Sequence, residues 1–415
     1  MSFIILYLIF VVTYILYGSV VIGGIGSPRS IMAIVMFFAC LFEKKKLKFD
    51  KYIVLYLVFV FFYAISSYST GFFSDFLGRF FRQNFVSCVC FWSTYLYVKK
   101  SNKDVNTLMY IFMGVGLLDA VITIGQFSNA SFSTDLMNLL GISIDEEYSD
   151  TAASVSDLYG YVMPGIFGQV TNGYYLSITC LFALYSRKGK IRWYNILMWL
   201  IIVYALFLCQ ERSAFFMGVL LSLFCFYKNM KDKLNIVFRM VVTTAVLLLL
   251  LNLRDFIMSG DTRYALGLDL TNRDFILIHA LAFIQDNLLQ GGFHLYMQTN
   301  PYPHNLALNA LIYGGLFGGI VILALVFLQS IKVIKYIFRP MKEIDLSAFI
   351  FGLAFLAFTA SSIFHNLSVV SGEGIIWIIW AAFFFIGYGD KEKKKYVTNK
   401  SMTNENSNNT IRLSR

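Results

Sequence analysis

The stretch Pro301-Tyr302-Pro303-His304-Asn305 leads directly into a long apolar run, Leu306 to Gln329. The run opens Leu-Ala-Leu-Asn-Ala-Leu and continues with Gly314-Gly315-Leu-Phe-Gly318-Gly319. It is long enough to cross a bilayer as a helix, which needs about 20 apolar residues. The two prolines restrict the backbone on either side of the tyrosine. The sequence therefore predicts a titratable histidine on a rigid turn, where a water-exposed loop enters a membrane.

Apolar blocks of similar length recur along the whole chain. Hydrophobic residues make up 58% of the 415 residues and charged residues only 14%, whereas roughly a quarter of a soluble domain is charged. We count about twelve candidate spans: 3–22, 28–42, 52–69, 84–98, 107–127, 171–186, 193–209, 213–227, 234–253, 305–330, 346–364 and 374–388. The pattern predicts an all-α polytopic membrane protein with a single transmembrane domain over 1–390. The Asn- and Ser-rich segment 391–415 is expected to be a disordered cytoplasmic tail.

Positive charge is confined to alternate loops. The formal net charge is +10, but 27 of the 34 lysine and arginine residues, including every lysine, lie in six segments. These segments are 43–51, 99–103, 187–192, 228–239, 332–342 and the tail from Lys391. Basic residues favour cytoplasmic loops, so both termini are predicted to be cytoplasmic. The charge then reflects topology, and no nucleic-acid partner is expected.

The seven remaining basic residues all lie on the predicted external side. They are all arginines: Arg29, Arg79, Arg82, Arg212, Arg254, Arg263 and Arg273. Each could be an incidental surface charge or a ligand for a phosphate group, and both interpretations stay open. The absence of lysine suits a phosphate ligand, because the planar guanidinium binds phosphate oxygens bidentately and stays charged at low dielectric.

Two external loops are long. The first, 128–170, carries six acidic residues and no basic one, and it is either a lid over a substrate or a solvated cap. The second, 254–304, is the large loop between the ninth and tenth spans. It contains a predicted helix that Thr271-Asn272 caps and Gly291-Gly292 ends. Arg273 would lie at the N-terminus of that helix, the end that attracts anions.

A charged pair joins two spans almost without a loop, in Gln210-Glu211-Arg212-Ser213. Charges at such a junction are costly unless they face a polar cavity. The pair could neutralise itself in a tight turn, or Arg212 could lie over an anionic ligand at the membrane edge. Both interpretations stay open.

The order of these parts resembles the O-antigen ligase and polymerase superfamily of bacterial envelope glycosyltransferases. The motif-bearing part covers roughly 205–325. An Arg-Ser-small turn at Arg212 opens a span, and a long external loop follows it. An Arg-led helix then runs into Asp-Asn-x-Leu-x-Gly-Gly-Phe, Asp286 to Phe293. Pro-His-Asn and a Gly-Gly-x-x-Gly span complete the pattern.

The resemblance implies a GT-C-like fold and an enzyme of the bacterial plasma (inner) membrane. Its activity would be metal-independent, inverting glycosyl transfer at the outer face, without a cofactor. The donor would be an undecaprenyl-pyrophosphate-linked oligosaccharide. The catalytic positions of the family fall on Arg212, Arg273 and His304.

Elementary chemistry agrees with that implication. Arginines can neutralise a leaving diphosphate without a metal ion, and no Asp-x-Asp motif occurs to hold one. A neutral histidine can accept the proton of an acceptor hydroxyl. His279, His294 and His365 compete for this role, but His304 has the flanking prolines and the glycine-rich span.

Further external residues are predicted to bind substrate: Arg254, Arg263, Arg79, Arg82, Glu211, Tyr302 and Asn305. The leading hypothesis is a repeat-unit polymerase for O-antigen or capsular polysaccharide, which must hold a second lipid-linked diphosphate and so needs extra cations. Three alternatives stay open: a ligase that transfers glycan to a lipid A core, a flippase for lipid-linked oligosaccharides, and a structural or sensory membrane protein. Membrane lipid and a chain-length regulator protein are the candidate partners.

Overall fold

The computed structural model describes residues 2–17, 27–43, 49–128, 130–140, 165, 169–186, 191–209, 211–229, 270–303, 305–363 and 369–389. Every regular element in these ranges is a helix, and no strand occurs in them. The all-α prediction is therefore confirmed for the described part of the chain. The predicted span 234–253 and the predicted tail 391–415 lie outside it.

The helices follow the apolar blocks. In chain order they are α1 (Phe3–Leu16), α2 (Pro28–Phe42), α3 (Lys51–Ser69), α4 (Phe73–Arg79), the π-helix η1 (Phe80–Asn84), α5 (Phe85–Lys100), α6 (Asn106–Phe127), α7 (Ser131–Leu139), α9 (Gln169–Ala183), α10 (Trp193–Leu208), α11 (Arg212–Asn229), α13 (Leu270–Asp286), α14 (Phe293–Tyr296), α15 (Leu306–Ile337), the 3₁₀ turn η2 (Met341–Glu343), α16 (Leu346–Ser362) and a final helix, Gly374–Gly389. Three of them, α3, α6 and α15, are long and apolar enough to cross a membrane, and several others are shorter but apolar.

Side-chain caps mark where several helices begin. Ser27 accepts a hydrogen bond from the Ser30 amide, with Pro28 as the first residue of α2. Asp50 caps α3 by accepting from the Tyr52 amide, and Asp345 caps α16 in the same way. Such caps satisfy backbone N–H groups that have no partner within the helix.

Aromatic residues of the final helix lie at the centre of the bundle. Trp377 and Trp380 are almost fully buried. The ring of Trp380 lies 4.8 Å from that of Tyr52 in α3 and 5.3 Å from that of Phe355 in α16. The last helix of the described residues therefore packs against both α3, early in the chain, and α16, late in it.

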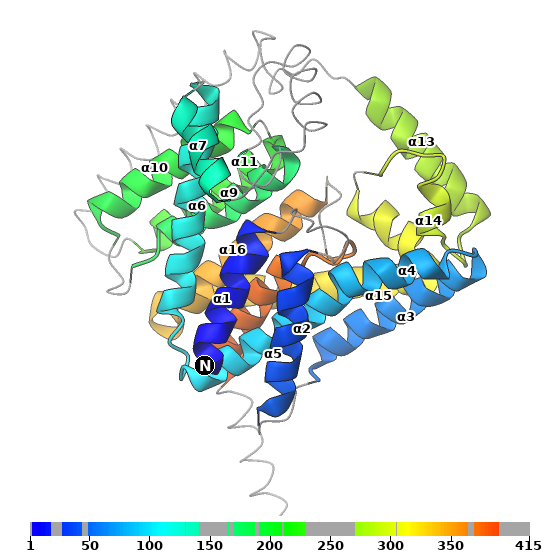
Figure 1. Ribbon diagram of the computed structural model, residues 1–415, viewed down its shortest axis with the longest axis horizontal. Helices are drawn as coiled ribbons and strands as arrows, with labels where there is room; N and C mark the ends of the chain where they lie inside the picture. Colours follow the sequence, from blue (N-terminus) through cyan, green and yellow to red (C-terminus); the bar gives the residue numbers. More distant parts are fainter. Residues whose placement is uncertain are drawn as a thin grey trace, which may run out of the picture.

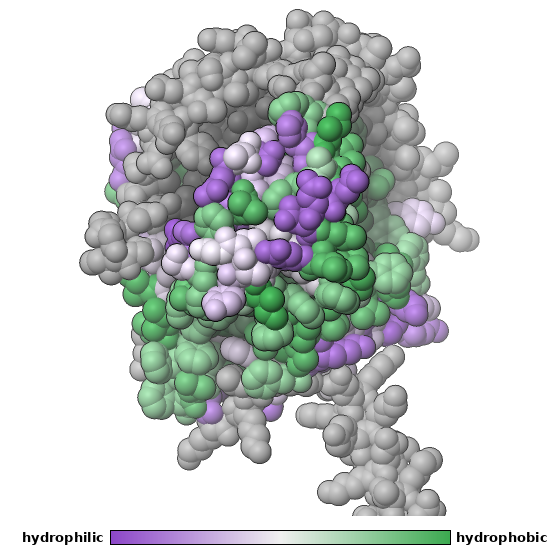
Figure 2. All heavy atoms as spheres, turned by 90° about the vertical axis from the view of Figure 1, so that its right-hand side faces the viewer, coloured by the Kyte–Doolittle hydropathy of each residue, from purple (hydrophilic) through white to green (hydrophobic). Residues whose placement is uncertain are grey.

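The helices form two groups around that centre (Figure 1). Helices α6, α9, α10 and α11 pack together on one side, with α7 at their end. On the other side, α15 packs along α3, and the pair carries α4, α13 and α14. Figure 2 looks at this second side and shows hydrophilic residues gathered above a broad hydrophobic band.

A break inside α15 fixes the segment that follows α13. Gly315 has φ 61° and ψ −165°, so the backbone leaves the helical path there. The Gly292 amide donates to the Ile312 carbonyl at 2.8 Å, and the Leu316 amide donates to the Leu288 carbonyl at 2.7 Å. These bonds satisfy the backbone groups that the break releases. They also explain why α13 ends at Asp286, earlier than the predicted end at Gly291-Gly292.

Glycine makes this backbone contact possible. A Cβ on Gly291 would lie 2.6 Å from the Gly315 nitrogen, and a Cβ on Gly315 would lie 2.3 Å from the Leu289 oxygen. The two glycine motifs that the sequence separates by more than twenty positions therefore pack against each other. The short helix α14 begins directly after this contact, so its position relative to α3 and α15 is fixed.

Candidate functional site

A polar pocket of about 480 Å³ lies where α2, α4, η1 and α14 meet. Its lining residues are Ser27, Arg29, Asp75, Arg79, Arg82, Gln83 and His294. Small-molecule sites occupy roughly 300–1,000 Å³, so the pocket has room for a ligand of that size. Three of the seven arginines predicted to be external line it: Arg29 from the start of α2, and Arg79 and Arg82 from a segment about fifty positions later.

The Nε atoms of Arg79 and Arg82 each form a hydrogen bond within their own helical segment. The Nε–H of Arg79 donates to Gln83 Oε1 at 2.7 Å, and the Nε–H of Arg82 donates to the Gly78 carbonyl at 3.1 Å. A terminal amino group of Arg79 is also hydrogen-bonded to the Tyr302 hydroxyl. The remaining terminal amino groups of the two guanidinium groups can bind phosphate oxygens. Among the described residues no carboxylate forms an ion pair with either arginine.

Aromatic rings fix the plane of Arg79. Its guanidinium carbon lies 4.4 Å from the ring centre of Phe293 in α14 and 5.1 Å from that of Tyr313 in α15. Arginine stacks on aromatic faces, and lysine cannot reproduce this geometry. The π-helix η1 begins directly after Arg79, and π-helical insertions are frequent at functional sites.

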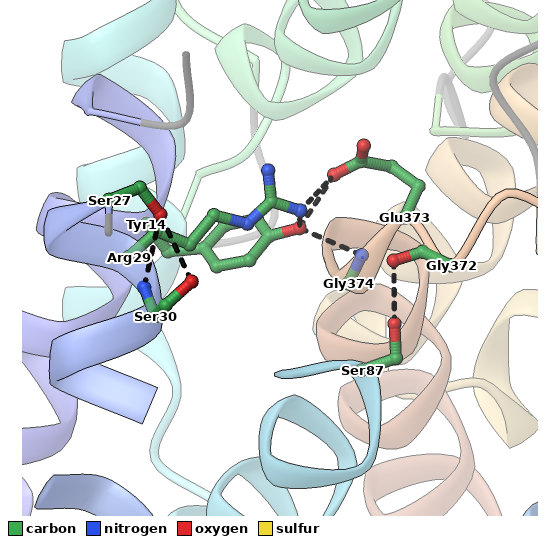
Figure 3. Close-up of polar contacts among 8 residues, drawn as sticks. All are labelled: Tyr14, Ser27, Arg29, Ser30, Ser87, Gly372, Glu373 and Gly374. Carbon is green, nitrogen blue, oxygen red and sulfur yellow. Dashed lines mark hydrogen bonds and ion pairs between the residues drawn. The ribbon is translucent and has the colours of Figure 1, made fainter. Parts of the chain in front are cut away.

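Arg29 forms one wall of the pocket and has a different environment. Its guanidinium donates to Glu373 Oε1 at 3.1 Å and to the Tyr14 hydroxyl (Figure 3). The Tyr14 hydroxyl in turn donates to Glu373 at 2.6 Å and accepts from the Gly374 amide at 2.8 Å. The side chains of Arg29 and Glu373 are only 13% and 12% exposed. This arginine is therefore neutralised within the protein and ties α1, α2 and the final helix together.

His294 lies on α14 and faces the same pocket. Its Nε2 atom is 2.8 Å from the Tyr63 hydroxyl of α3, and its ring stacks on those of Tyr63 and Phe72. Partial burial and the charge of Arg79 lower the pKa of His294 below its usual 6.5, against the opposing charge of Asp75. The surroundings of the imidazole therefore favour its neutral form.

Two of the predicted substrate-binding residues have structural partners here. The Tyr302 hydroxyl lies 2.9 Å from that of Tyr313 and close to Arg79, and burial raises the pKa of Tyr302 so that it keeps its proton. Tyr302 therefore belongs to the surroundings of the pocket. Asn305 caps α15, because its side-chain oxygen accepts from the amides of Ala307 and Leu308 at 2.9 and 3.1 Å.

The other predicted site residues lie elsewhere. Glu211, at the junction of α10 and α11, is near Tyr174 and Cys209, and Cys209 is also near the fully buried Asp119. Arg212 and Arg273 lie near the starts of α11 and α13, and their side chains are outside the described residues, as are His304, Arg254 and Arg263 entirely. The structure thus brings Arg79, Arg82 and Tyr302 together and places Glu211 in a separate polar cluster.

Sequence reasoning missed the lining residues Ser27, Asp75 and Gln83 and the contact of Tyr63 with His294. It named Arg29 as an external arginine but not its ion pair with Glu373. The spacing Arg79-x-x-Arg82 is a usable signal, because residues three apart share one face of a helix. The hydrogen bond between Tyr63 and His294 joins residues 231 positions apart and leaves no local trace in the sequence.

Comparison of the chain with known protein families gives no match, and comparison with curated proteins gives none either. The function proposed below is therefore based on the pocket, the charge pattern and the sequence motifs.

Proposed function

We propose that this protein is a membrane glycosyltransferase that lengthens a surface polysaccharide by joining lipid-diphosphate-linked oligosaccharides. The observation that carries the proposal is the pocket, where Arg79 and Arg82 lie beside His294 and neither arginine forms an ion pair with a described carboxylate. Arginine clusters without a paired carboxylate suit a diphosphate group, which carries several negative charges.

The chemistry needs only a few groups. The bond between the anomeric carbon and the phosphate oxygen breaks, and its electron pair leaves with the diphosphate. A bond forms from the acceptor hydroxyl to the anomeric carbon, and the hydroxyl proton passes to a base. Arginines stabilise the leaving diphosphate. The resemblance to the O-antigen ligase and polymerase superfamily assigns donor binding to Arg212 and Arg273. It assigns removal of the acceptor hydroxyl proton to His304.

The active site in this proposal faces the outside of a bacterial plasma membrane, within a bundle of about twelve spans with a GT-C-like arrangement. Two observations support this placement. The pocket collects residues only from segments that the lysine distribution puts on the external side. Figure 2 shows hydrophilic residues gathered on this face directly beside a broad hydrophobic surface.

The pocket favours a polymerase over a ligase. A polymerase holds two lipid-linked diphosphates at once, one as donor and one as acceptor. Arg79 and Arg82 supply cations in addition to the arginines assigned to the donor, and the pocket brings them together. We therefore propose that it holds the diphosphate of the second lipid-linked glycan.

The test is the surface polysaccharide of a strain that lacks this protein, separated on a gel. A polymerase mutant keeps single repeats, either on the core or on the lipid carrier. A bare core with long lipid-linked polymer in the membrane would identify a ligase instead. Repeats retained on the cytoplasmic leaflet would identify a flippase.

A further inference from the structure

We infer that the pocket binds the diphosphate group of a lipid-linked molecule through Arg79 and Arg82, and that His294 becomes a third ligand by gaining a proton when the diphosphate enters. This inference extends the proposed function, in which that molecule is the lipid-linked glycan. Binding itself needs no glycosyl transfer, so it can be tested separately.

Geometry supports the two arginines as fixed ligands. Their Nε atoms are anchored within α4 and η1, and Arg79 is also stacked on Phe293. A ligand that approaches the terminal amino groups therefore meets guanidinium groups that are already oriented, which reduces the entropy lost on binding. Arg29 contributes less, since Glu373 already neutralises it.

The charges around the pocket also explain why His294 would gain a proton when a diphosphate binds. His294 is surrounded by Arg79 and Arg82 from α4 and η1, by Asp75 from α4, by Tyr63 from α3, and by the Arg29–Glu373 pair across the pocket. Partial burial and, after it, the positive charge of Arg79 disfavour the imidazolium ion. A diphosphate would bring more negative charge than Asp75 supplies, and an adjacent anion favours the charged form of histidine. Uptake of one proton by His294 then adds a charge-assisted hydrogen bond to the ligand.

The surface beside the pocket favours a ligand with a lipid tail. Phe73, Leu77 and Phe81 follow one another at four-residue spacing along α4 and η1, so they form one stripe. They are 40%, 40% and 58% exposed. An amphipathic helix of this kind lies in the interface of a membrane, with its arginines at the level of lipid head groups. The diphosphate of a polyprenyl carrier would occur at that depth, whereas free pyrophosphate would gain nothing from the stripe.

The binding experiment uses the full chain in nanodiscs and two probes, inorganic pyrophosphate and a polyprenyl diphosphate, between pH 6 and pH 8. We expect the polyprenyl diphosphate to bind more tightly than pyrophosphate. We expect Arg79→Lys and Arg82→Lys each to weaken binding by about tenfold or more, because lysine loses the bidentate contact. Equal affinity for the two probes would overturn the assignment to a lipid, and unchanged affinity in both variants would overturn the site.

Proton uptake by His294 is tested by comparing the pH dependence of diphosphate binding in the wild type and in His294→Gln. Phosphate groups themselves titrate near pH 6, so this variant provides the baseline for the pH dependence of the ligand alone. Wild-type affinity should rise more steeply as the pH falls, by at most about tenfold per pH unit beyond the baseline. His279→Gln, which changes a histidine outside the pocket lining, should behave like the wild type. Identical slopes in the wild type and His294→Gln would exclude the proton-linked ligand.

A variant that binds more tightly than the wild type cannot be explained by misfolding, and Asp75→Asn is expected to be such a variant. Asp75 lines the pocket and repels an anion, so Asp75→Asn should bind the diphosphate about two- to fivefold more tightly at pH 8. Unfolding cannot produce this result, and weaker binding by Asp75→Asn would contradict the site.

Diphosphate binding without polymer formation would contradict only the proposed polymerase. Polymer formation with unaltered binding in the arginine variants would contradict only this inference.

Discussion

Arg29 and Arg79 line the same pocket but have opposite environments. Arg29 is paired with Glu373 and almost buried, whereas Arg79 rests on aromatic rings and has no carboxylate partner among the described residues. The first arginine holds three helices together, and the second remains available to a ligand. The two arginines therefore differ in role because their partner groups differ.

The ion pair gives a stability prediction. Glu373→Gln leaves the buried guanidinium of Arg29 without its counter-charge, and breaking a buried pair in this way costs about 3–5 kcal/mol. Thermal unfolding in detergent should show a clear loss of stability. Glu343→Gln provides the control, because Glu343 lies exposed in η2 and its replacement should change stability by less than about 0.5 kcal/mol. Equal stability of the two variants would show that the Arg29–Glu373 pair is not important for the fold.

His294 gives a prediction for pH. Its pKa is lower in the folded protein than the value of about 6.5 in an unfolded chain. The folded state therefore binds fewer protons, so its stability is complete above pH 6.5 and decreases as the pH falls through the folded pKa. Without ligand, His294→Gln should lose less thermal stability than the wild type between pH 7 and pH 5. A larger loss in the variant would contradict the lowered pKa.

The motif histidine can be tested in the same background. If His304 is the base, His304→Ala should abolish transfer while the protein remains in the membrane, because a positioned base contributes about 10²–10⁴-fold to the rate. His279→Ala should keep its activity. Normal polymer from the His304→Ala strain would assign the base to another residue, and His294 would be the next to examine.

Among the elements, α15 and the segment after α13 depend on each other. The break at Gly315 exposes backbone groups, and residues 288–292 satisfy them. That contact determines where α14 begins and hence where Phe293 and His294 lie. The glycine motifs are thus needed for the position of the pocket as well as for the helix itself.

Replacing Gly315 tests this dependence. Gly315→Ala would force a Cβ to within 2.3 Å of the Leu289 oxygen at a φ of 61°. We expect a loss of at least about 2 kcal/mol of stability, together with weaker diphosphate binding. Gly114→Ala in α6 is the matched control, since a Cβ there meets nothing within 4 Å. Unchanged binding in Gly315→Ala would separate the helix break from the site.

The sequence predicts some of these features and not others. Apolar blocks and lysine positions predict the helices and the side on which the arginines lie, because burial and charge act through local composition. The Gly-Gly motifs are visible as well, but their mutual contact joins residues that only the tertiary fold brings together. The same limit applies to Tyr63 and Glu373, whose roles depend on partners hundreds of positions away.

At the scale of the whole molecule, the pocket draws its residues from segments that the lysine distribution predicts to be external. This agrees with a topology in which every lysine is cytoplasmic. Reporters fused near Lys46 and Lys231 should report the cytoplasm, and one near Ser149 should report the external side. A cytoplasmic signal at Ser149 would reverse the orientation and place the pocket on the wrong side for an extracellular polysaccharide.

The most direct measurement is elongation by the purified protein in proteoliposomes, with an undecaprenyl-diphosphate-linked repeat unit as the sole substrate and excess chelator present. We expect a ladder of lipid-linked products with two, three and more repeats, and release of one undecaprenyl diphosphate for each bond formed. We expect the ladder to be lost in the Arg79→Lys/Arg82→Lys double variant. A substrate that stays at a single repeat, or that crosses the bilayer without growing, would contradict a polymerase. Elongation only after addition of a divalent metal would contradict the metal-independent chemistry assigned to the arginines.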